Sequence, residues 1–156
     1  FHKVEFVKLI EEMVEDMKLI ADQKKVKLVF HKPLRQVPNI SVDSEKLRLA
    51  FMNIVDNALQ YTHAKGKVDI QIEYENHILI SVKDTGVGIP KNQMMRVFSK
   101  FFRADNAVRM QTAGSGLGLF IAKNIIEKHG GEIWVESEEG KGTTVYFTIP
   151  VQEHLG

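Results

Sequence analysis

Hydrophobic residues recur at helical spacing in three long segments of the chain. In residues 6–21 they fall three or four positions apart with acidic residues between them, which predicts an amphipathic helix. A second such pattern covers residues 43–62 and begins at an Asp-Ser pair that suits an N-cap. A third begins near residue 116 and ends at His129, which two glycines follow. A shorter helix is expected over residues 90–99.

Segments of alternating apolar and polar residues predict strands between these helices. The predicted strands cover residues 26–30, 39–42, 68–74, 78–82, 132–137 and 143–149. Strands and helices come in groups, with hairpins of adjacent strands, and do not alternate strictly as in a βαβ protein. The pattern therefore predicts an α+β fold in which helices pack on one face of one sheet. The polar stretch at 104–115 has no periodicity, and we expect a mobile loop there.

Composition and charge narrow the class of protein. A chain of 156 residues with 44% hydrophobic residues suits one compact domain. It has no cysteine, which excludes disulfides, thiolate metal sites and a thiol nucleophile. Lys and Arg total 21 against 20 Asp and Glu, so nothing in the net charge points to nucleic acid or a membrane surface. No apolar run approaches the ~20 residues of a membrane span and no signal-peptide pattern is present. Because the chain opens on Phe1 without a Met, we expect a fragment of a longer protein.

Two glycine-rich loops carry the first candidate chemistry. The loop at residues 114–118 opens a predicted helix, where backbone N–H groups and the helix dipole favour phosphate; a plain flexible turn is the alternative. The loop at 84–88 follows a strand and begins with Asp84, an acid that would repel phosphate. Asp84 fits better as an acceptor for an exocyclic amine such as adenine N6, unless it only caps a turn. Neither loop matches the P-loop, Rossmann or protein-kinase glycine patterns.

Three side-chain amides lie on one face of the helix predicted at 43–62. Asn53, Asn57 and Gln60 occupy positions i, i+4 and i+7, which is unusual because asparagine is a poor helix former. The carbonyl oxygen of Asn57 suits a hydrated Mg²⁺ beside phosphates. The alternative is a solvated polar face.

Five motifs in order resemble the N, G1, F, G2 and G3 boxes of bacterial sensor histidine kinases. They are Asn53-x-x-x-Asn57-Ala58, Asp84-x-Gly86-x-Gly88, Phe98-x-x-Phe101-x-Arg103, Gly114-x-Gly116-x-Gly118-Leu119 and Gly140-x-Gly142-Thr143. The resemblance runs from about Asp43 to Pro150. It implies the Bergerat ATP-binding fold, a two-layer α/β sandwich with a mixed, mostly antiparallel sheet and helices on one face. It also implies one domain over residues 1–156, with a core at about 24–150 and a lead-in helix at 1–23.

The resemblance implies a role for each site residue. Asp84 would accept from adenine N6, Gly86 and Gly88 would let the base approach the backbone, and Asn57 would coordinate Mg²⁺. Residues 104–115 would form the lid over ATP. Asn53 and Arg103 are the expected catalytic residues. The expected nucleotide-binding set is Asn53, Asn57, Gln60, Tyr61, Asp84, Gly86, Gly88, Ile89, Arg103, Gly114, Ser115, Gly116, Leu117, Gly118, Leu119 and Thr143.

The predicted function is transfer of the γ-phosphoryl group of ATP to a histidine on a separate dimerisation domain. The chain lacks the histidine motif that would receive the group, and its six histidines are expected to be ordinary surface residues. The expected partners are the helices of that domain and, indirectly, a response regulator. The expected location is the cytoplasm, in a parent protein that can be an inner-membrane sensor.

Two other functions stay open. In hydrolytic ATPases of the same fold the position of Asn53 holds a Glu that activates water, and an amide cannot replace that base. A catalytically weak nucleotide-binding scaffold is the second alternative, because Gln60 stands where many histidine kinases carry Lys.

Overall fold

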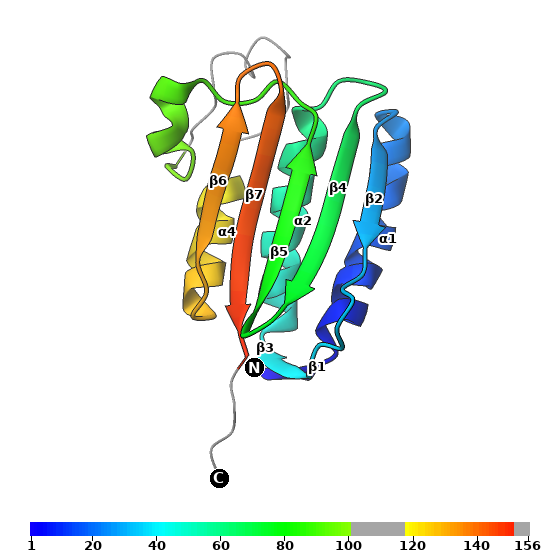
Figure 1. The fold of residues 1–156 in the computed structure, drawn as a ribbon, viewed down its shortest axis with the longest axis vertical. Coiled ribbons are helices and arrows are strands. Elements are labelled where there is room, and N and C mark those ends of the chain that lie inside the picture. The colour runs from blue at the N-terminus through cyan, green and yellow to red at the C-terminus, as the bar shows by residue number, and fades with distance from the viewer. Residues whose placement is uncertain (101–117, 152–156) are drawn as a thin grey trace.

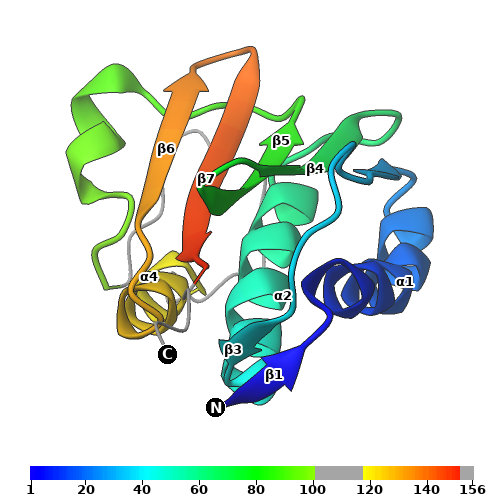
Figure 2. The ribbon, with the colours of Figure 1, turned by 60° about the horizontal axis from the view of Figure 1, so that its bottom comes forward.

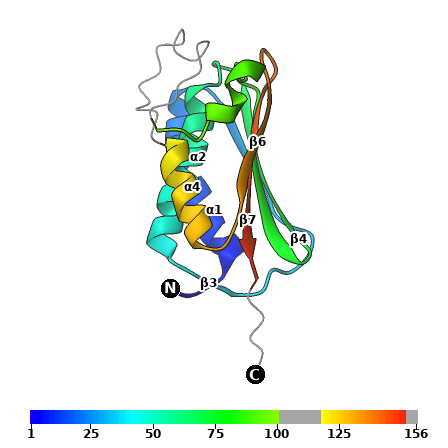
Figure 3. The ribbon, with the colours of Figure 1, turned by 90° about the vertical axis from the view of Figure 1, so that its left-hand side faces the viewer.

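The structure, a computed structural model, describes residues 1–100 and 118–151. Figure 1 shows a sheet of long strands seen face-on, and Figure 3 shows the helices gathered in a layer on one side of that sheet. The elements in chain order are β1 (His2–Val4), α1 (Phe6–Gln23), β2 (Lys27–His31), β3 (Ile40–Val42), α2 (Ser44–Gln60), β4 (Lys67–Tyr74), β5 (His77–Asp84), the 3-10 helix η1 (Lys91–Arg96), α4 (Gly118–Lys128), β6 (Ile133–Glu138) and β7 (Gly142–Pro150). The predicted two-layer α+β architecture is confirmed.

The main sheet has five strands in the order β2-β4-β5-β7-β6. Strands β2 and β4 are parallel, and the other three neighbouring pairs are antiparallel. The sheet is therefore mixed and mostly antiparallel, as the resemblance implied. The β5–β7 pair is the longest-range antiparallel contact of this sheet, and its register places Asp84 opposite Thr143.

Alternation along the strands gives the sheet one buried face. Along β4 and β5 buried side chains alternate with more exposed ones, and Ile70, Ile72 and Ile80 are among the buried set. The apolar stripes of α1, α2 and α4 cover this face, and Phe6 and Phe51 lie at the centre with no exposed surface. Burying such a stripe, more than intrinsic helix propensity, is what stabilises helices of this length.

The helix α2 begins where the sequence predicted. Asp43 is its N-cap, and the side-chain Oδ1 accepts a hydrogen bond of 3.1 Å from the backbone N–H of Lys46. Such a cap satisfies one of the N–H groups that the first helical turn leaves without a partner. Among the described residues, no helix combines the length and apolar character that crossing a bilayer requires.

Three expectations need correction. The main sheet is not alone, because β1 and β3 form a second, two-stranded antiparallel sheet below it, visible in Figure 2. The short helix expected at 90–99 is a 3-10 helix over Lys91–Arg96. His129 is not a surface residue, since only 8% of it is exposed. The loop expected at 104–115 lies outside the described residues.

The segments that carry the predicted site residues lie at one end of the two-layer fold. In Figure 1 the last turn of α2, the end of β5 and the turn between β6 and β7 all lie at the top of the molecule. The start of α4 faces the same way in Figure 3. The segments that carry the predicted site are therefore gathered at one end, and the core below holds them.

Candidate nucleotide site

Asp84 is the last residue of β5 and is 6% exposed. Its Oδ1 accepts two backbone hydrogen bonds, from Gly86 N–H at 2.8 Å and from Thr143 N–H at 3.1 Å. Burial raises the pKa of this carboxyl group from 3.8 to about 6, and the two N–H donors act in the opposite direction. Within the described part of the chain, no hydrogen bond reaches Oδ2. One carboxylate oxygen is thus committed to the fold, and the other is left for a donor on a ligand.

The loop after Asp84 leaves no room for side chains at two positions. A Cβ atom on Gly86 would collide with the carbonyl oxygen of Tyr61 and lie 2.9 Å from Asp84 Oδ1. Gly88 has φ +71° and would place a Cβ against the carbonyl oxygen of Glu138. Both glycines let the backbone pass close to neighbouring chain segments, which other residues would prevent. The predicted need for glycine here therefore has a steric basis inside the protein as well as toward a ligand.

Hydrogen bonds fasten the loop to α2 and to the β6–β7 hairpin. Val87 N–H donates to the Tyr61 carbonyl at 3.1 Å, and Ile89 N–H donates to Ser137 Oγ at 2.8 Å. Ser137 Oγ also lies 2.7 Å from Thr143 Oγ1. Sequence reasoning missed Ser137, since no motif contains it. The only available signal was its place on a strand directly before the Gly140-Lys141-Gly142 turn.

A small second core supports the same loop. Ile89 and Val97 are buried together, and Tyr61 and Phe98 pack against them. Tyr61 is also the C-cap of α2. The end of α2, the Asp84 loop and the segment around η1 thus share one apolar cluster beside the site.

The amides of α2 lie where α4 begins. A Cβ built on Gly118, the first residue of α4, would lie 3.7 Å from both Cβ and the carbonyl oxygen of Asn53. This close approach puts the N-terminal end of α4 beside the amide face of α2. Asn53 and Asn57 are both half-buried and one helical turn apart.

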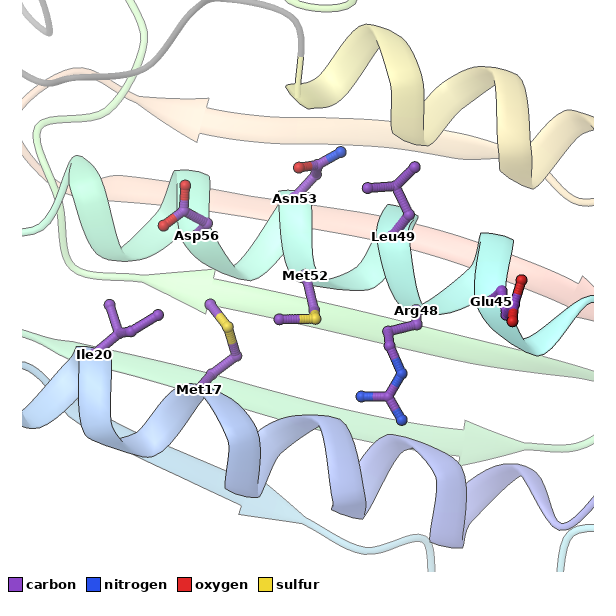
Figure 4. A pocket seen from close by; sticks show the side chains of 8 residues that line it. All are labelled: Met17, Ile20, Glu45, Arg48, Leu49, Met52, Asn53 and Asp56. Carbon is purple, nitrogen blue, oxygen red and sulfur yellow. The ribbon is translucent and has the colours of Figure 1, made fainter.

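Gln60 is already engaged with its own helix. Its Nε2 donates to Asp56 Oδ2 at 2.7 Å. Asp56 and Asn53 also line an open pocket of about 410 Å³ between α1 and α2, shown in Figure 4. Met17 and Met52 face one another across that pocket, and Glu45, Arg48, Asn53 and Asp56 also line it, so its walls are mixed in character.

The remaining predicted residues divide into two groups. Leu119 is buried in the main core, so its side chain serves packing and only its backbone is left to face a ligand. Arg103, Gly114, Ser115, Gly116 and Leu117 lie outside the described residues. Their predicted roles therefore stay predictions.

The arrangement can select an adenine base and an anion at the same end of the fold. A buried carboxylate oxygen accepts strongly from an amine because little water competes for it. A helix N-terminus favours negative charge. The described residues contain no cluster of three or more His, Asp or Glu side chains able to hold a metal. Mg²⁺ needs none, because it is commonly held by one protein oxygen together with phosphates and water.

Comparison with known proteins decides the family. The family model described as "Histidine kinase-, DNA gyrase B-, and HSP90-like ATPase" matches residues 42–153. The chain belongs to this family. Sensor histidine kinase WalK of Bacillus subtilis is 41% identical over 150 residues, which cover 91% of this chain and 24% of WalK. The chain therefore spans about a quarter of the length of that curated relative.

Solved histidine kinases share the fold of this family member. The nucleotide-free catalytic domain of ThkA matches with a TM-score of 0.82 and 29% identity, covering 97% of this chain and 95% of that domain. ThkA solved with the response regulator protein TrrA matches at 0.79 and 27%, covering 97% and 42%. Full-length ShkA in complex with AMPPNP matches at 0.83 and 27%, covering 99% and 32%. The chain is thus similar to the catalytic part of longer kinases.

Proposed function

We propose that this domain binds Mg-ATP and donates its γ-phosphoryl group to a histidine on the dimerisation helices of the same kinase. The observation that carries the proposal is Asp84, a buried carboxylate whose Oδ1 is held by two backbone N–H groups, while Oδ2 accepts no hydrogen bond from residues 1–100 or 118–151. It stands at the same end of the fold as the amide face of α2 and the start of α4. The histidine kinase relatives support the same function.

The base and the phosphates would meet different residues. Asp84 Oδ2 accepts from adenine N6, while Gly86 and Gly88 keep the loop backbone close to the base, with Ile89 beside it; Tyr61 would contact the phosphate side of the nucleotide. The residues proposed to hold the triphosphate are Asn53, Gln60, Arg103, Gly114, Ser115, Gly116, Leu117, Gly118 and Leu119, with Thr143 supporting Asp84. Asn57 would hold Mg²⁺ through its carbonyl oxygen. The metal ion neutralises charge on the phosphate oxygens when it is bound.

Asn53 favours transfer to an external histidine over hydrolysis. An activated water needs a base, and the amide of Asn53 does not accept a proton at neutral pH. Phosphoryl transfer depends mainly on positioning and on stabilising charge, and a neutral imidazole attacks through its own lone pair, so a domain that donates to an external histidine can omit a base of its own. Asn53 and Arg103 are the residues we assign to that stabilisation.

The partners and location follow from the same proposal. The acceptor helices belong to the parent kinase, and a response regulator would take the phosphoryl group from them; ThkA has been solved with such a regulator. We propose a cytoplasmic location, with a parent that can be a membrane sensor. Neither nucleic acid nor membrane is a proposed partner of this domain.

The test uses γ-labelled ATP with the domain alone and then with the dimerisation helices added. The domain alone should bind Mg-ATP, label no residue of its own and release phosphate slowly. Adding the helices should give acid-labile, base-stable label on the helices alone. The transfer should be slow, because separated modules lose an advantage of roughly 10²–10⁴-fold. Rapid phosphate release that Asn53→Ala abolishes would contradict the kinase assignment, and absence of ATP binding would contradict both enzymatic functions.

A further inference from the structure

His129 makes specific contacts at the opposite end of the molecule from Asp84. It follows α4 directly and is 8% exposed. Its Nε2 accepts a hydrogen bond of 3.1 Å from the backbone N–H of Asp43, and its Nδ1 lies 2.9 Å from the carbonyl oxygen of Ile125. An N–H can only donate and a carbonyl can only accept, so these partners specify a neutral imidazole with its proton on Nδ1.

The Asp43 N–H is not an ordinary helical donor. Asp43 is the N-cap of α2, and backbone N–H groups at a helix start have no acceptor within the helix. The side chain of Asp43 already caps Lys46, so His129 supplies a second cap that comes from another helix. The ring of Phe1 stacks on His129 at 4.7 Å between centroids, which holds the imidazole plane.

Two contact points lie at the two ends of the packing between α4 and α2. One joins Asp43 to His129, and the other brings Gly118 against Asn53. The two points are ten residues apart on α2 and eleven apart on α4. At 1.5 Å per residue these runs are about 15 and 16.5 Å, so the antiparallel helices match in length between the contacts. The lower contact therefore supports the upper one across the packed interface of the two helices.

We propose that His129 is a positioning residue for nucleotide binding. Its neutral imidazole locks the end of α4 to the start of α2, and the lock holds the N-terminus of α4 beside the amide face that contains Asn53. A slip by one helical turn would displace these groups by about 5.4 Å, far beyond hydrogen-bonding tolerance. The inference rests on the proposed function, since it assigns His129 to the same nucleotide site from a distance.

Two substitutions of His129 distinguish loss of its hydrogen bond to Asp43 from a general loss of stability. A Gln side chain reaches about as far as Nε2, so His129→Gln keeps an acceptor for Asp43 N–H. An Asn side chain reaches about as far as Nδ1, so His129→Asn keeps a partner for the Ile125 carbonyl and loses the contact with α2. Calorimetry should show Mg-ATP affinity within about twofold of wild type for His129→Gln and about fivefold or more weaker for His129→Asn. The weakening reflects the smaller fraction of molecules in the competent register.

Measurements on the nucleotide-free domain test the lock without ATP. ¹⁵N NMR of wild-type imidazole should show a protonated Nδ1 and an unprotonated Nε2 in His129. Hydrogen exchange at the Asp43 amide should be protected in wild type and in His129→Gln, and at least about tenfold faster in His129→Asn. His77→Gln, at an exposed histidine that begins β5, is the matched control and should change neither readout.

The outcomes are separable. A proton on Nε2, or an unprotected Asp43 amide in wild type, overturns the lock whether or not any variant folds. A confirmed lock with equal ATP affinity in all folded variants overturns the positioning role. Failure of the wild-type domain to bind Mg-ATP overturns the proposed function instead, and the nucleotide-free results still decide on the lock.

Discussion

Substituting Asp84 by Asn tests the adenine contact with little disturbance of the fold. The amide oxygen of the new side chain can take the place of Oδ1 and keep both bonds, from Gly86 N–H and Thr143 N–H. The amide nitrogen then occupies the place of Oδ2. It presents two hydrogens to the N6 amino group, which is itself a donor, so the contact with the base is lost while the loop is retained.

The size of the loss follows from the kind of bond removed. A hydrogen bond to a charged group contributes about 1.5–3 kcal/mol, and each ~1.4 kcal/mol is tenfold in affinity. Asp84→Asn should therefore weaken Mg-ATP binding by about 10- to 150-fold. The buried position, with 6% exposure, favours the upper part of that range because water cannot replace the lost acceptor.

Titration calorimetry on the folded variant is the assay, with thermal unfolding as a check that the domain is intact. Asp22→Asn is the matched control, because it removes the same charge from an exposed site at the end of α1 and should leave affinity unchanged. If Asp84→Asn binds Mg-ATP within twofold of wild type, Asp84 does not read the base and the reasoning from its free oxygen is wrong.

Three further predictions concern the same fold. Burial raises the pKa of Asp84 to about 6, so ionisation of this carboxyl group destabilises the nucleotide-free domain by up to about 3 kcal/mol. The full destabilisation is present above about pH 6 and is absent below about pH 4. Denaturant titration should thus find Asp84→Asn more stable than wild type at about pH 7.5 and equal to it at about pH 4; equal stability at both would refute the burial argument. Gly86→Ala should lower the free energy of unfolding by about 1–3 kcal/mol and weaken ATP binding, because the new Cβ meets the Tyr61 carbonyl; an unchanged melting temperature would show that the loop adjusts freely. Phe51→Ala should cost about 3–5 kcal/mol in urea unfolding, since Phe51 is fully enclosed, and a cost under about 1 kcal/mol would mean the site collapses around the smaller residue.

Local patterns predicted the elements that a single periodicity defines. The helix expected at 6–21 is α1 at Phe6–Gln23, and the hairpin expected at 68–82 is β4 and β5. These segments are long enough for the apolar spacing to be unambiguous. The order of the glycine and asparagine motifs also predicted the family, because five ordered motifs carry more information than any single loop.

Local sequence patterns could not predict contacts between residues that lie far apart in the chain. The three-residue β1 exists only because it pairs with β3, some forty residues away, so its own sequence carries little signal. The sequence predicts a surface position for His129, because a histidine before two glycines usually ends a helix in solvent. Its spacing from Ile125 and Ile126 puts it on the apolar face of α4, and this was the available clue. The hydrogen bonding of Asp84 was also beyond local patterns, because one of the two N–H groups that bind its Oδ1 belongs to Thr143, far along the chain.

The β5–β7 pairing has a consequence for how this domain tolerates change. Asp84 and Thr143 are hydrogen-bonded neighbours, so the segment between them leaves the sheet and returns to the same point. That segment is no free loop, because it contains β6, the edge strand of the sheet, and α4, whose apolar side chains belong to the main core. An insertion in it is compatible with the fold only where α4 and β6 keep their places. The strands β2 and β4 lie outside this segment, so they are the part of the sheet that such changes reach last.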